Sequence, residues 1–333
     1  KAVEDELNQW LLKIPNPAKD DVKIGKDESE NEVVRKSGEP TKFDFTPLDH
    51  LEIGQTLDII DVERAAKVSG ARFYYLKNEG VLLEFALLQF ALDTLLPEGF
   101  IPVLPPVLIK TEVMKKLGYM ENGGDEDMFH LEKDGLTLIG TAEHALVSMH
   151  MDETLDEKDL PRRYVGYSPS FRREAGSYGK DTRGILRVHQ FDKVEMVSFV
   201  AKGEDDKEHE YLLSLEEKLF QALKIPYQVV KMCTGDLGFP AARKFDLEAW
   251  MPGQNKYREV TSVSTIADFQ SRRLNIKYQN GDEKKFVSIL NGTAYAIGRT
   301  MIAILENFQQ EDGSVMIPEV LQKYMGISVI KPR

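Results

Sequence analysis

The stretch Phe171-Arg172-Arg173-Glu174 opens a glycine-rich cationic segment, 175–184, and four residues after it comes His189-Gln190-Phe191-Asp192-Lys193-Val194-Glu195. The pattern predicts two strands joined by a flexible loop. Such a pair can hold a nucleotide, with an arginine on a phosphate, Phe191 as a stacking face and a carboxylate on the adenine amino group. Taken alone, the stretch is equally consistent with a hairpin that carries surface charges.

Short alternating or apolar runs continue on both sides of this pair. Turn signals and one helical pattern, about 207–223, separate them. Strands that follow one another without regular helical crossovers indicate an antiparallel sheet with helices packed on it, so we expect an α+β fold. The expected strands are 136–139, 164–168, 190–199, 227–232, 244–251 and 257–263.

The beginning of the chain has the pattern of a helix end followed by an irregular connection. Residues 1–14 place Val3, Leu7, Trp10, Leu11 and Ile14 at helical spacing, and the prolines at 15 and 17 stop the pattern. We therefore expect the last turns of a longer helix. Residues 18–45 are polar and charged and predict an irregular connection.

Two helical patterns and a proline-bearing strand follow. Residues 61–68 and 82–96 predict helices, and the second is apolar on most of its surface, as expected for a helix buried against other elements or a partner subunit. The β-type run 100–109 contains Pro102, Pro105 and Pro106. Because proline removes a ladder donor, we expect an edge or interface strand there.

Two further constellations carry chemistry. In Arg258-Glu259-Val260-Thr261-Ser262, a carboxylate and a hydroxyl three residues apart can both offer oxygen ligands to Mg²⁺, although a strand with an exposed Glu has the same pattern. The segment 290–299 predicts a strand-to-helix junction, with a helix over about 293–307, Asn291 as its cap, Gly298 allowing close packing and Arg299 two turns in.

Composition limits the class of protein. The 333 residues are 42% hydrophobic and 29% charged, which indicates a folded protein. The net charge of −12 argues against non-specific coating of nucleic acid, although a basic patch lies between Arg162 and Arg187. One cysteine, Cys233, excludes internal disulfides and Cys-pair zinc sites. No uninterrupted apolar run approaches the ~18 residues of a membrane span, so we expect a cytoplasmic protein without membrane attachment.

The three constellations together resemble the signature motifs of the class II aminoacyl-tRNA synthetases. The strand pair is similar to motif 2 (about 164–196), the segment ending in Arg299 to motif 3 (about 287–307), and the helix with the proline strand to motif 1 (about 82–108). Longer strings resemble the serine-specific family, the seryl-tRNA synthetases of the common, zinc-free type. These strings are 64–73, Gly140-Thr141-Ala142-Glu143 and 233–238.

The resemblance implies a class II antiparallel sheet flanked by helices over residues 15–333, with residues 1–14 as the remnant of a helical tRNA-binding arm. It also implies activation of L-serine by ATP with Mg²⁺, release of pyrophosphate, and transfer of serine to the 3′ end of tRNA(Ser). Motif 1 implies a homodimer. Two alternatives stay open: a paralogue that loads a small amino acid onto a carrier protein, and a regulatory homologue that charges no tRNA.

The residue roles follow from the same resemblance. Arg172, Glu259 and Arg299 are the expected catalytic residues, and Glu259 with Ser262 the Mg²⁺ ligands. The expected ATP-binding residues are Arg172, Arg173, Glu174, Val188, Phe191, Glu259, Val260, Thr261, Ser262 and Arg299. The expected serine-binding residues are Thr141, Ala142, Glu143, Arg172, Glu195, Asn291 and Thr293. The expected contacts to the tRNA acceptor end are Lys180, Arg183 and Arg187.

The chain departs from the family pattern in two places. After Glu259, the family typically has a Ser-Ser-Cys-Ser-Asn-Cys-type run, whereas this chain reads Thr261-Ser262-Val263-Ser264-Thr265-Ile266. Glu259 and Ser262 are retained, while Thr265 in place of Asn changes the local pocket. The family also carries a long antiparallel coiled-coil arm, of which we expect only the stub up to about Ile14.

Overall fold

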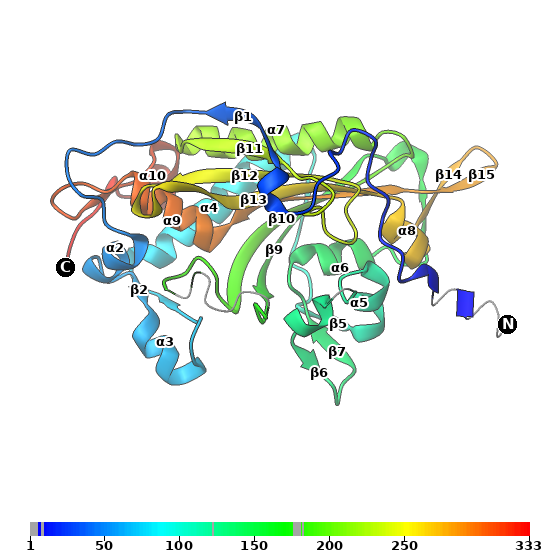
Figure 1. The fold of residues 1–333 in the computed structure, drawn as a ribbon, viewed down its shortest axis with the longest axis horizontal. Coiled ribbons are helices and arrows are strands. Elements are labelled where there is room, and N and C mark those ends of the chain that lie inside the picture. Colours follow the sequence, from blue (N-terminus) through cyan, green and yellow to red (C-terminus); the bar gives the residue numbers. More distant parts are fainter. Residues whose placement is uncertain (1–5, 8–9, 122, 176–180, 182) are drawn as a thin grey trace.

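An eight-stranded sheet forms the centre of the molecule (Figure 1). The computed structural model describes residues 6–7, 10–121, 123–175, 181 and 183–333. All neighbouring strands of this sheet are antiparallel except β4 and β9, which are parallel. The predicted antiparallel α+β fold is confirmed. In spatial order the strands are β1 (Glu32–Ser37), β11 (Tyr227–Lys231), β12 (Arg243–Met251), β13 (Lys256–Ala267), β16 (Ser288–Ala296), β10 (Gln190–Val200), β9 (Arg162–Phe171) and β4 (Ile101–Val103).

Three helices bury their apolar faces on this sheet. They are α4 (Glu79–Leu95), α7 (Asp205–Leu223) and α9 (Ile297–Asn307), and they share one core with β10, β12, β13 and β16. Three acidic residues in the first turn of α7 favour its N-terminus because they face the positive end of the helix dipole. A second core joins α5 (Thr111–Leu117) and α6 (Ala142–Ser148) to residues of β9 and β10.

Smaller elements complete the fold. A separate sheet of β5 (Leu108–Lys110), β7 (Leu136–Leu138) and β6 (His130–Leu131) takes the strand expected at 136–139 out of the main sheet. Further helices after residue 14 are α2 (His50–Thr56), α3 (Val62–Ser69), α8 (Phe269–Leu274) and α10 (Glu319–Met325). The remaining strands are β2 (Ile60–Asp61), β3 (Tyr75–Leu76), β8 (Thr154–Asp156), β14 (Lys277–Asn280), β15 (Glu283–Phe286), β17 (Val315–Met316) and β18 (Val329–Ile330).

The prediction of a helix starting near Thr293 with Asn291 as its cap was wrong. Residues 288–296 form β16, and α9 begins only at Ile297, so Arg299 lies in its first turn. Asn291 sits in mid-strand, between Val197 of β10 and Ser264 of β13. The adjacent Gly292 is closely packed: a Cβ there would lie 3.0 Å from Glu216 Oε1 and 3.2 Å from Val263 Cγ2, so these side chains would have to shift. The Asn-Gly pair therefore lies in a tightly packed strand and does not start a helix.

Only the first part of the proline-bearing run 100–109 forms the predicted edge strand. Among the described residues β4 pairs with β9 alone, with Pro102 opposite Val165, whereas Leu108 and Ile109 belong to β5 of the separate sheet. The polar segment 18–45 is not wholly irregular, because it contains β1 at the other edge of the sheet. The side chains of β1 are mostly exposed, which explains why no alternation of apolar residues marks it in the sequence.

Helix α4 accounts for the most apolar part of the chain. Among the described residues, only the helical stretch Glu79–Glu98 is long and apolar enough to cross a membrane. Leu83, Leu87 and Leu95 are fully buried in the core, whereas Leu82 and Phe85 are about half exposed. Near the N-terminus, the described residues Glu6, Leu7, Trp10 and Leu11 are helical, in agreement with the expected stub, while Val3 lies outside the described residues.

Candidate active site

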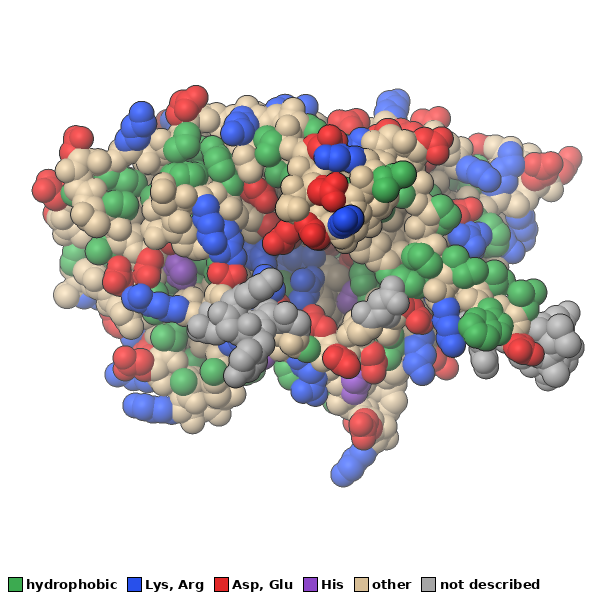
Figure 2. Space-filling view, viewed as in Figure 1, with side chains coloured by type: hydrophobic (Ala, Val, Ile, Leu, Met, Phe, Trp, Pro, Cys, Tyr) green, Lys and Arg blue, Asp and Glu red, His purple; other side chains and the backbone are tan. Residues whose placement is uncertain are grey.

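A cavity of about 410 Å³ opens on the sheet and brings the three distant constellations together. Figure 2 shows the hollow near the centre of this face, with acidic and basic side chains gathered around it. Most of the predicted site residues line it: Thr141, Glu143, Arg172, Glu174, Val188, Phe191, Glu195, Glu259, Val260, Thr261, Ser262, Asn291, Thr293 and Arg299. Ala142, Arg173 and Arg183 do not line it, and Lys180 lies outside the described residues.

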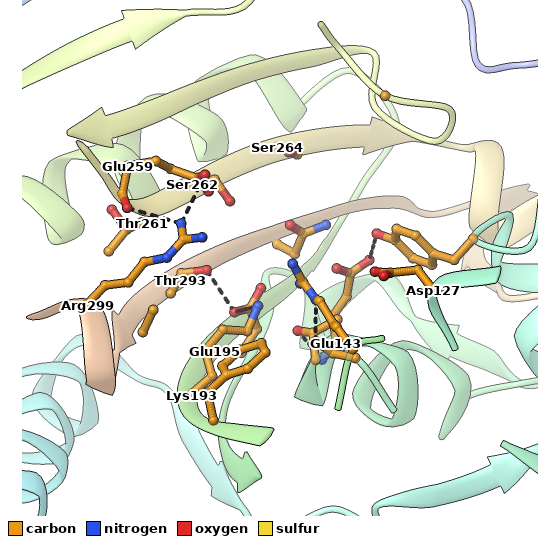
Figure 3. A pocket seen from close by; sticks show the side chains of 18 of the residues that line it. Asp127, Glu143, Lys193, Glu195, Glu259, Thr261, Ser262, Ser264, Thr293 and Arg299 are labelled. Atoms are coloured by element: carbon orange, nitrogen blue, oxygen red, sulfur yellow. Dashed lines mark hydrogen bonds and ion pairs between the residues drawn. The ribbon is translucent and has the colours of Figure 1, made fainter. Parts of the chain in front are cut away.

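Two β-bulges turn extra side chains toward the cavity. In β13, Val260 is an additional residue where the pairing with β12 shifts. Because strand side chains alternate between faces, residues three apart normally point in opposite directions, and one inserted residue puts Glu259 and Ser262 on the same face (Figure 3). In β16, Ala294 is additional in the same way, so Thr293 and Ala296 both line the cavity.

Glu195 is a buried carboxylate with two partners. Thr293 Oγ1 donates to Glu195 Oε2 at 3.0 Å, and Lys193 Nζ lies 2.7 Å from the same oxygen. Glu195 and Lys193 are two residues apart on β10, so they share one face of the strand. Only 1% of Glu195 is exposed, so its charge requires this compensation. The arrangement is a polar recess that can accept an ammonium group and a small hydroxyl.

Glu143 forms the opposite wall of this recess (Figure 3). Tyr119 Oη donates to Glu143 Oε1 at 2.6 Å, and Gln270 Nε2 donates to the same oxygen at 3.1 Å. Burial, together with the nearby charge of Glu195, raises the pKa of Glu143 above its ordinary value. Thr141 caps α6 through a bond from the Glu143 N–H at 3.3 Å, which fixes the first turn that presents the carboxyl group.

Arg172 lies between this recess and an aromatic face. Its Nε donates to the Gly140 carbonyl oxygen at 3.2 Å, and its guanidinium lies 5.4 Å from the centre of the Phe191 ring. The remaining N–H groups of the fork can bind an anion in the cavity. Arg173 points elsewhere: its Nε donates to the Met128 carbonyl oxygen at 2.7 Å and its guanidinium packs on Phe129.

At the far end of the cavity, Glu259 of β13 pairs with Arg299 of α9 (Figure 3). The poorly solvated cavity opposes ionisation of Glu259, but the positive charges of Arg299 and Lys244 lower the pKa of this carboxyl group to about 2. An ionised carboxylate beside the Ser262 hydroxyl fits a hard cation such as Mg²⁺. No three Asp, Glu, His or Cys side chains of the described residues could hold a metal together, so further ligands would be other oxygens, such as those of water or a phosphate.

Arg187 is placed differently from what its expected tRNA contact suggests. Its side chain lines the cavity, with Nη1 2.8 Å from Glu174 Oε2. Arg183, by contrast, is largely exposed and lies 3.5 Å from Asp49 Oδ2 and 3.4 Å from Glu52 Oε1. The structure therefore separates two arginines that are only four positions apart, with one inside the cavity and one outside it.

Sequence reasoning missed several residues of the site. Lys193 could have been found from its position two residues before Glu195 on a strand. Lys244 also lines the cavity, and its charge helps to keep Glu259 ionised. Tyr119 and Gln270 are far from every motif in the chain and contact the site only through the tertiary fold, so no local signal marks them.

The fold and this site define the catalytic core of a class II aminoacyl-tRNA synthetase. The sequence model described as "tRNA synthetase class II core domain (G, H, P, S and T)" matches residues 128–308. A prolyl-tRNA synthetase of Giardia lamblia shares the fold, with a TM-score of 0.70 over 83% of this chain and 56% of its own chain, at 18% identity.

Proteins with higher sequence identity to this chain show which family of this class it belongs to. A serine–tRNA ligase of Dictyoglomus thermophilum is 52% identical over 99% of this chain and 78% of its own length, and one of Acidothermus cellulolyticus is 53% identical over 97% and 76%. The crystal structure of seryl-tRNA synthetase from Pyrococcus horikoshii complexed with ATP has a TM-score of 0.96 and 44% identity, and covers 100% of this chain and 79% of its own. This chain belongs to the seryl-tRNA synthetase family.

Proposed function

We propose that this chain activates L-serine with ATP and transfers it to the 3′ end of tRNA(Ser). The observation that carries the proposal is the cavity itself. It combines a small polar recess made by Glu195, Thr293 and Glu143 with an anion-binding end made by Arg172 and Arg299. One end suits an amino acid with an ammonium and a hydroxyl group, and the other suits a polyphosphate.

The first step joins a carboxylate oxygen of serine to the α-phosphorus of ATP and breaks the bond to the β-phosphate, so that pyrophosphate leaves. The serine carboxylate is already ionised at pH 7, so the step needs no general base. Catalysis then consists of holding two anions in line and compensating their charge. Arg172, Arg187 and Arg299 all line the cavity. In this proposal Arg172 binds the two anions where they meet, and Arg299 and Arg187 bind the distal phosphates.

Glu259 and Ser262 would hold Mg²⁺, which when bound neutralises phosphate charge as the reaction proceeds. Phe191 offers a ring for adenine, and Glu174 and Val188 lie beside it in the cavity wall. Arg173 and Ala142 do not line the cavity, so any contribution from them would be indirect. Gly298 lines the cavity near Arg299. A Cβ there would lie 3.6 Å from the nearest protein atom, so the absence of a side chain at this position leaves room for a ligand.

Selection of serine follows from the recess. A site that hydrogen-bonds a hydroxyl group rejects alanine because a buried polar group would be left unpaired. The extra methyl group of threonine must be excluded by volume.

The proposals for the rest of the molecule rest on its resemblance to the seryl-tRNA synthetase family. Residues 1–14 would end a tRNA-binding helical arm, and residues 15–333 would form the catalytic domain. The loop carrying Arg183 would contact the acceptor end of tRNA, and α4 with β4 would form a homodimer interface. We place the reaction in the cytoplasm, with ATP and Mg²⁺ and without zinc.

Amino-acid-dependent exchange of pyrophosphate into ATP, measured with each standard amino acid in turn, tests the first step. A second assay asks whether labelled serine passes to tRNA or to an acyl-carrier protein. We expect exchange with serine alone and label on tRNA(Ser). Label on the carrier protein would contradict the proposal, and so would exchange without any transfer to tRNA.

A further inference from the structure

A buried acid lies beneath the catalytic strands. Glu216, on α7, is fully buried, and its Oε2 accepts a hydrogen bond from Thr261 Oγ1 of β13 at 2.7 Å. Its other oxygen, Oε1, has no hydrogen-bond partner among the described residues. Oε1 lies against Gly292 of β16, where a Cβ would come within 3.0 Å of it. One carboxyl group thus contacts the two strands that carry Glu259, Ser262, Asn291 and Thr293.

The fold itself gives no reason for an acid at this position. Leu212, Leu215, Leu219 and Phe220 surround it on α7, and all are buried in the main core. A polar group buried with one oxygen unpaired is unfavourable, and an apolar side chain of similar size would cost less. Burial also raises the pKa of Glu216 well above its ordinary value.

The position of Thr261 indicates what the acid does. Thr261 directly follows the extra residue Val260. It lines the cavity together with Glu259 and Ser262, but its hydroxyl donates to Glu216 on α7. At a bulge the ladder is locally disrupted, so pairing alone holds the strand less firmly there. The hydrogen bond to Glu216 fixes the position of Thr261 next to the bulge. If the bulge moved by one residue, Ser262 would turn away from Glu259.

We propose that Glu216 is a positioning residue that acts through Thr261 to keep Glu259 and Ser262 side by side as a cation-binding pair. The inference rests on the proposed function, because it assumes that this pair holds Mg²⁺ during serine activation. It adds a residue on the other side of the sheet that touches neither substrate nor metal.

The test measures serine-dependent pyrophosphate exchange as a function of Mg²⁺ concentration. E216M removes the hydrogen bond, E216Q retains one, and T261V removes it from the other partner. We expect E216M and T261V to raise the Mg²⁺ concentration for half-maximal exchange about fivefold, and E216Q to restore it to within about twofold of the unaltered chain. The double variant E216M/T261V should be no worse than either single variant, because both remove the same bond.

Three controls make the result decisive. The KM for serine should change less than the Mg²⁺ dependence, since the hydrogen bond ends on Thr261 of β13, the strand of the Mg²⁺ pair, while only the unpaired Oε1 lies against Gly292. L212M, a change one turn away on α7, should leave the Mg²⁺ dependence unaltered. E259Q should shift the Mg²⁺ dependence strongly, since it alters the cation ligand itself.

These controls separate the two proposals. If E259Q leaves the Mg²⁺ dependence unaltered, the proposed cation site is wrong and this inference falls with it. If E259Q shifts the dependence but E216M and T261V do not, only the role of Glu216 is overturned. A change in melting temperature without a change in Mg²⁺ dependence would likewise reduce Glu216 to a structural residue.

Discussion

One nitrogen of Arg299 makes two contacts with Glu259, one with its carboxylate and one with its backbone carbonyl group. Arg299 Nη1 lies 3.0 Å from Glu259 Oε2 and also donates to the Glu259 carbonyl oxygen at 3.0 Å. The Nε of Arg299 also donates to the Leu186 carbonyl oxygen at 3.4 Å. The guanidinium is thereby oriented before any phosphate arrives, and the Nη2 end of its fork can bind a ligand.

This orientation predicts the effect of Arg299→Lys. Lysine keeps the charge but cannot contact Glu259 and a phosphate through a planar fork. We expect kcat/KM for ATP in the exchange reaction to fall about 10- to 100-fold. The melting temperature serves as a control for folding. Exchange equal to that of the unaltered chain would show that only the charge at this position is needed.

Replacing Glu195 tests the amino acid end of the cavity. Glu195→Ala removes the acceptor for Thr293 and leaves Lys193 buried without its partner. We expect serine-dependent exchange to fall by at least about 100-fold, because the ammonium group of serine loses its counter-charge and meets that of Lys193. Binding of ATP, measured directly by calorimetry, should change little. Exchange near the level of the unaltered chain would rule out Glu195 as a serine-binding residue.

The two arginines on either side of the cavity wall predict opposite effects. Arg187 lines the cavity beside Glu174, so Arg187→Ala should lower the exchange rate about tenfold. Arg183 is exposed, so Arg183→Ala should leave exchange within about twofold and lower only the charging of tRNA. The two variants are matched in charge and are compared in both assays. Equal loss of exchange in both variants would contradict this division.

His209 predicts a loss of stability in acid. Burial lowers its pKa to about 4, and because Arg243 Nε donates to Nδ1, that nitrogen cannot also carry a proton. The unfolded chain, with a histidine pKa near 6.5, binds a proton that the native chain does not. The contribution of His209 to the free energy of unfolding is therefore complete above about pH 6.5. About 3 kcal/mol of it is lost as the pH falls from there to 4. Urea unfolding from pH 7 to pH 4.5 should show a shallower loss in His209→Gln, and identical slopes would refute this account.

The half-exposed apolar side chains of the proposed interface predict the state of assembly. Leu82, Phe85, Ile101 and Leu104 are 48%, 56%, 45% and 81% exposed. We expect a dimer in sedimentation at micromolar concentration, and a shift toward monomer in Leu104→Asp, because a charge there would be buried between two copies. Ile24→Asp, at a residue 87% exposed on another segment, is the matched control. A monomeric unaltered chain would contradict the proposed interface.

The long strands and α7 could be predicted from the sequence because they repeat their apolar pattern over many residues. The class of the site could be predicted because Arg172, Glu259 and Arg299 lie in recognisable strings. Other features depend on tertiary contacts that no local pattern records. The start of α9 was misplaced because Asn291-Gly292 has the composition of a helix start, whereas the pair lies in β16 and Gly292 packs closely against Glu216.

The same limit applies to the bulge at Val260 and to the placement of Arg187. A bulge adds one residue to a strand without changing its composition, so the sequence shows a carboxylate and a hydroxyl three residues apart but not why they share a face. Arg183 and Arg187 look alike in a basic run, and only the packing of the chain against Glu174 and Glu52 assigns them to different surroundings.

The pairing of Lys193 with Glu195 has a consequence for how a substrate enters. Lys193 already balances the charge of Glu195, so at this end of the recess an arriving amino acid exchanges one ammonium group for another. The new attraction between opposite charges then comes from the carboxylate of serine and Arg172, and the ammonium end should add little to the dependence of affinity on ionic strength. A neutral residue in place of Lys193 would leave an anionic hole that small cations such as Na⁺ could occupy, and the amino acid would then compete with salt.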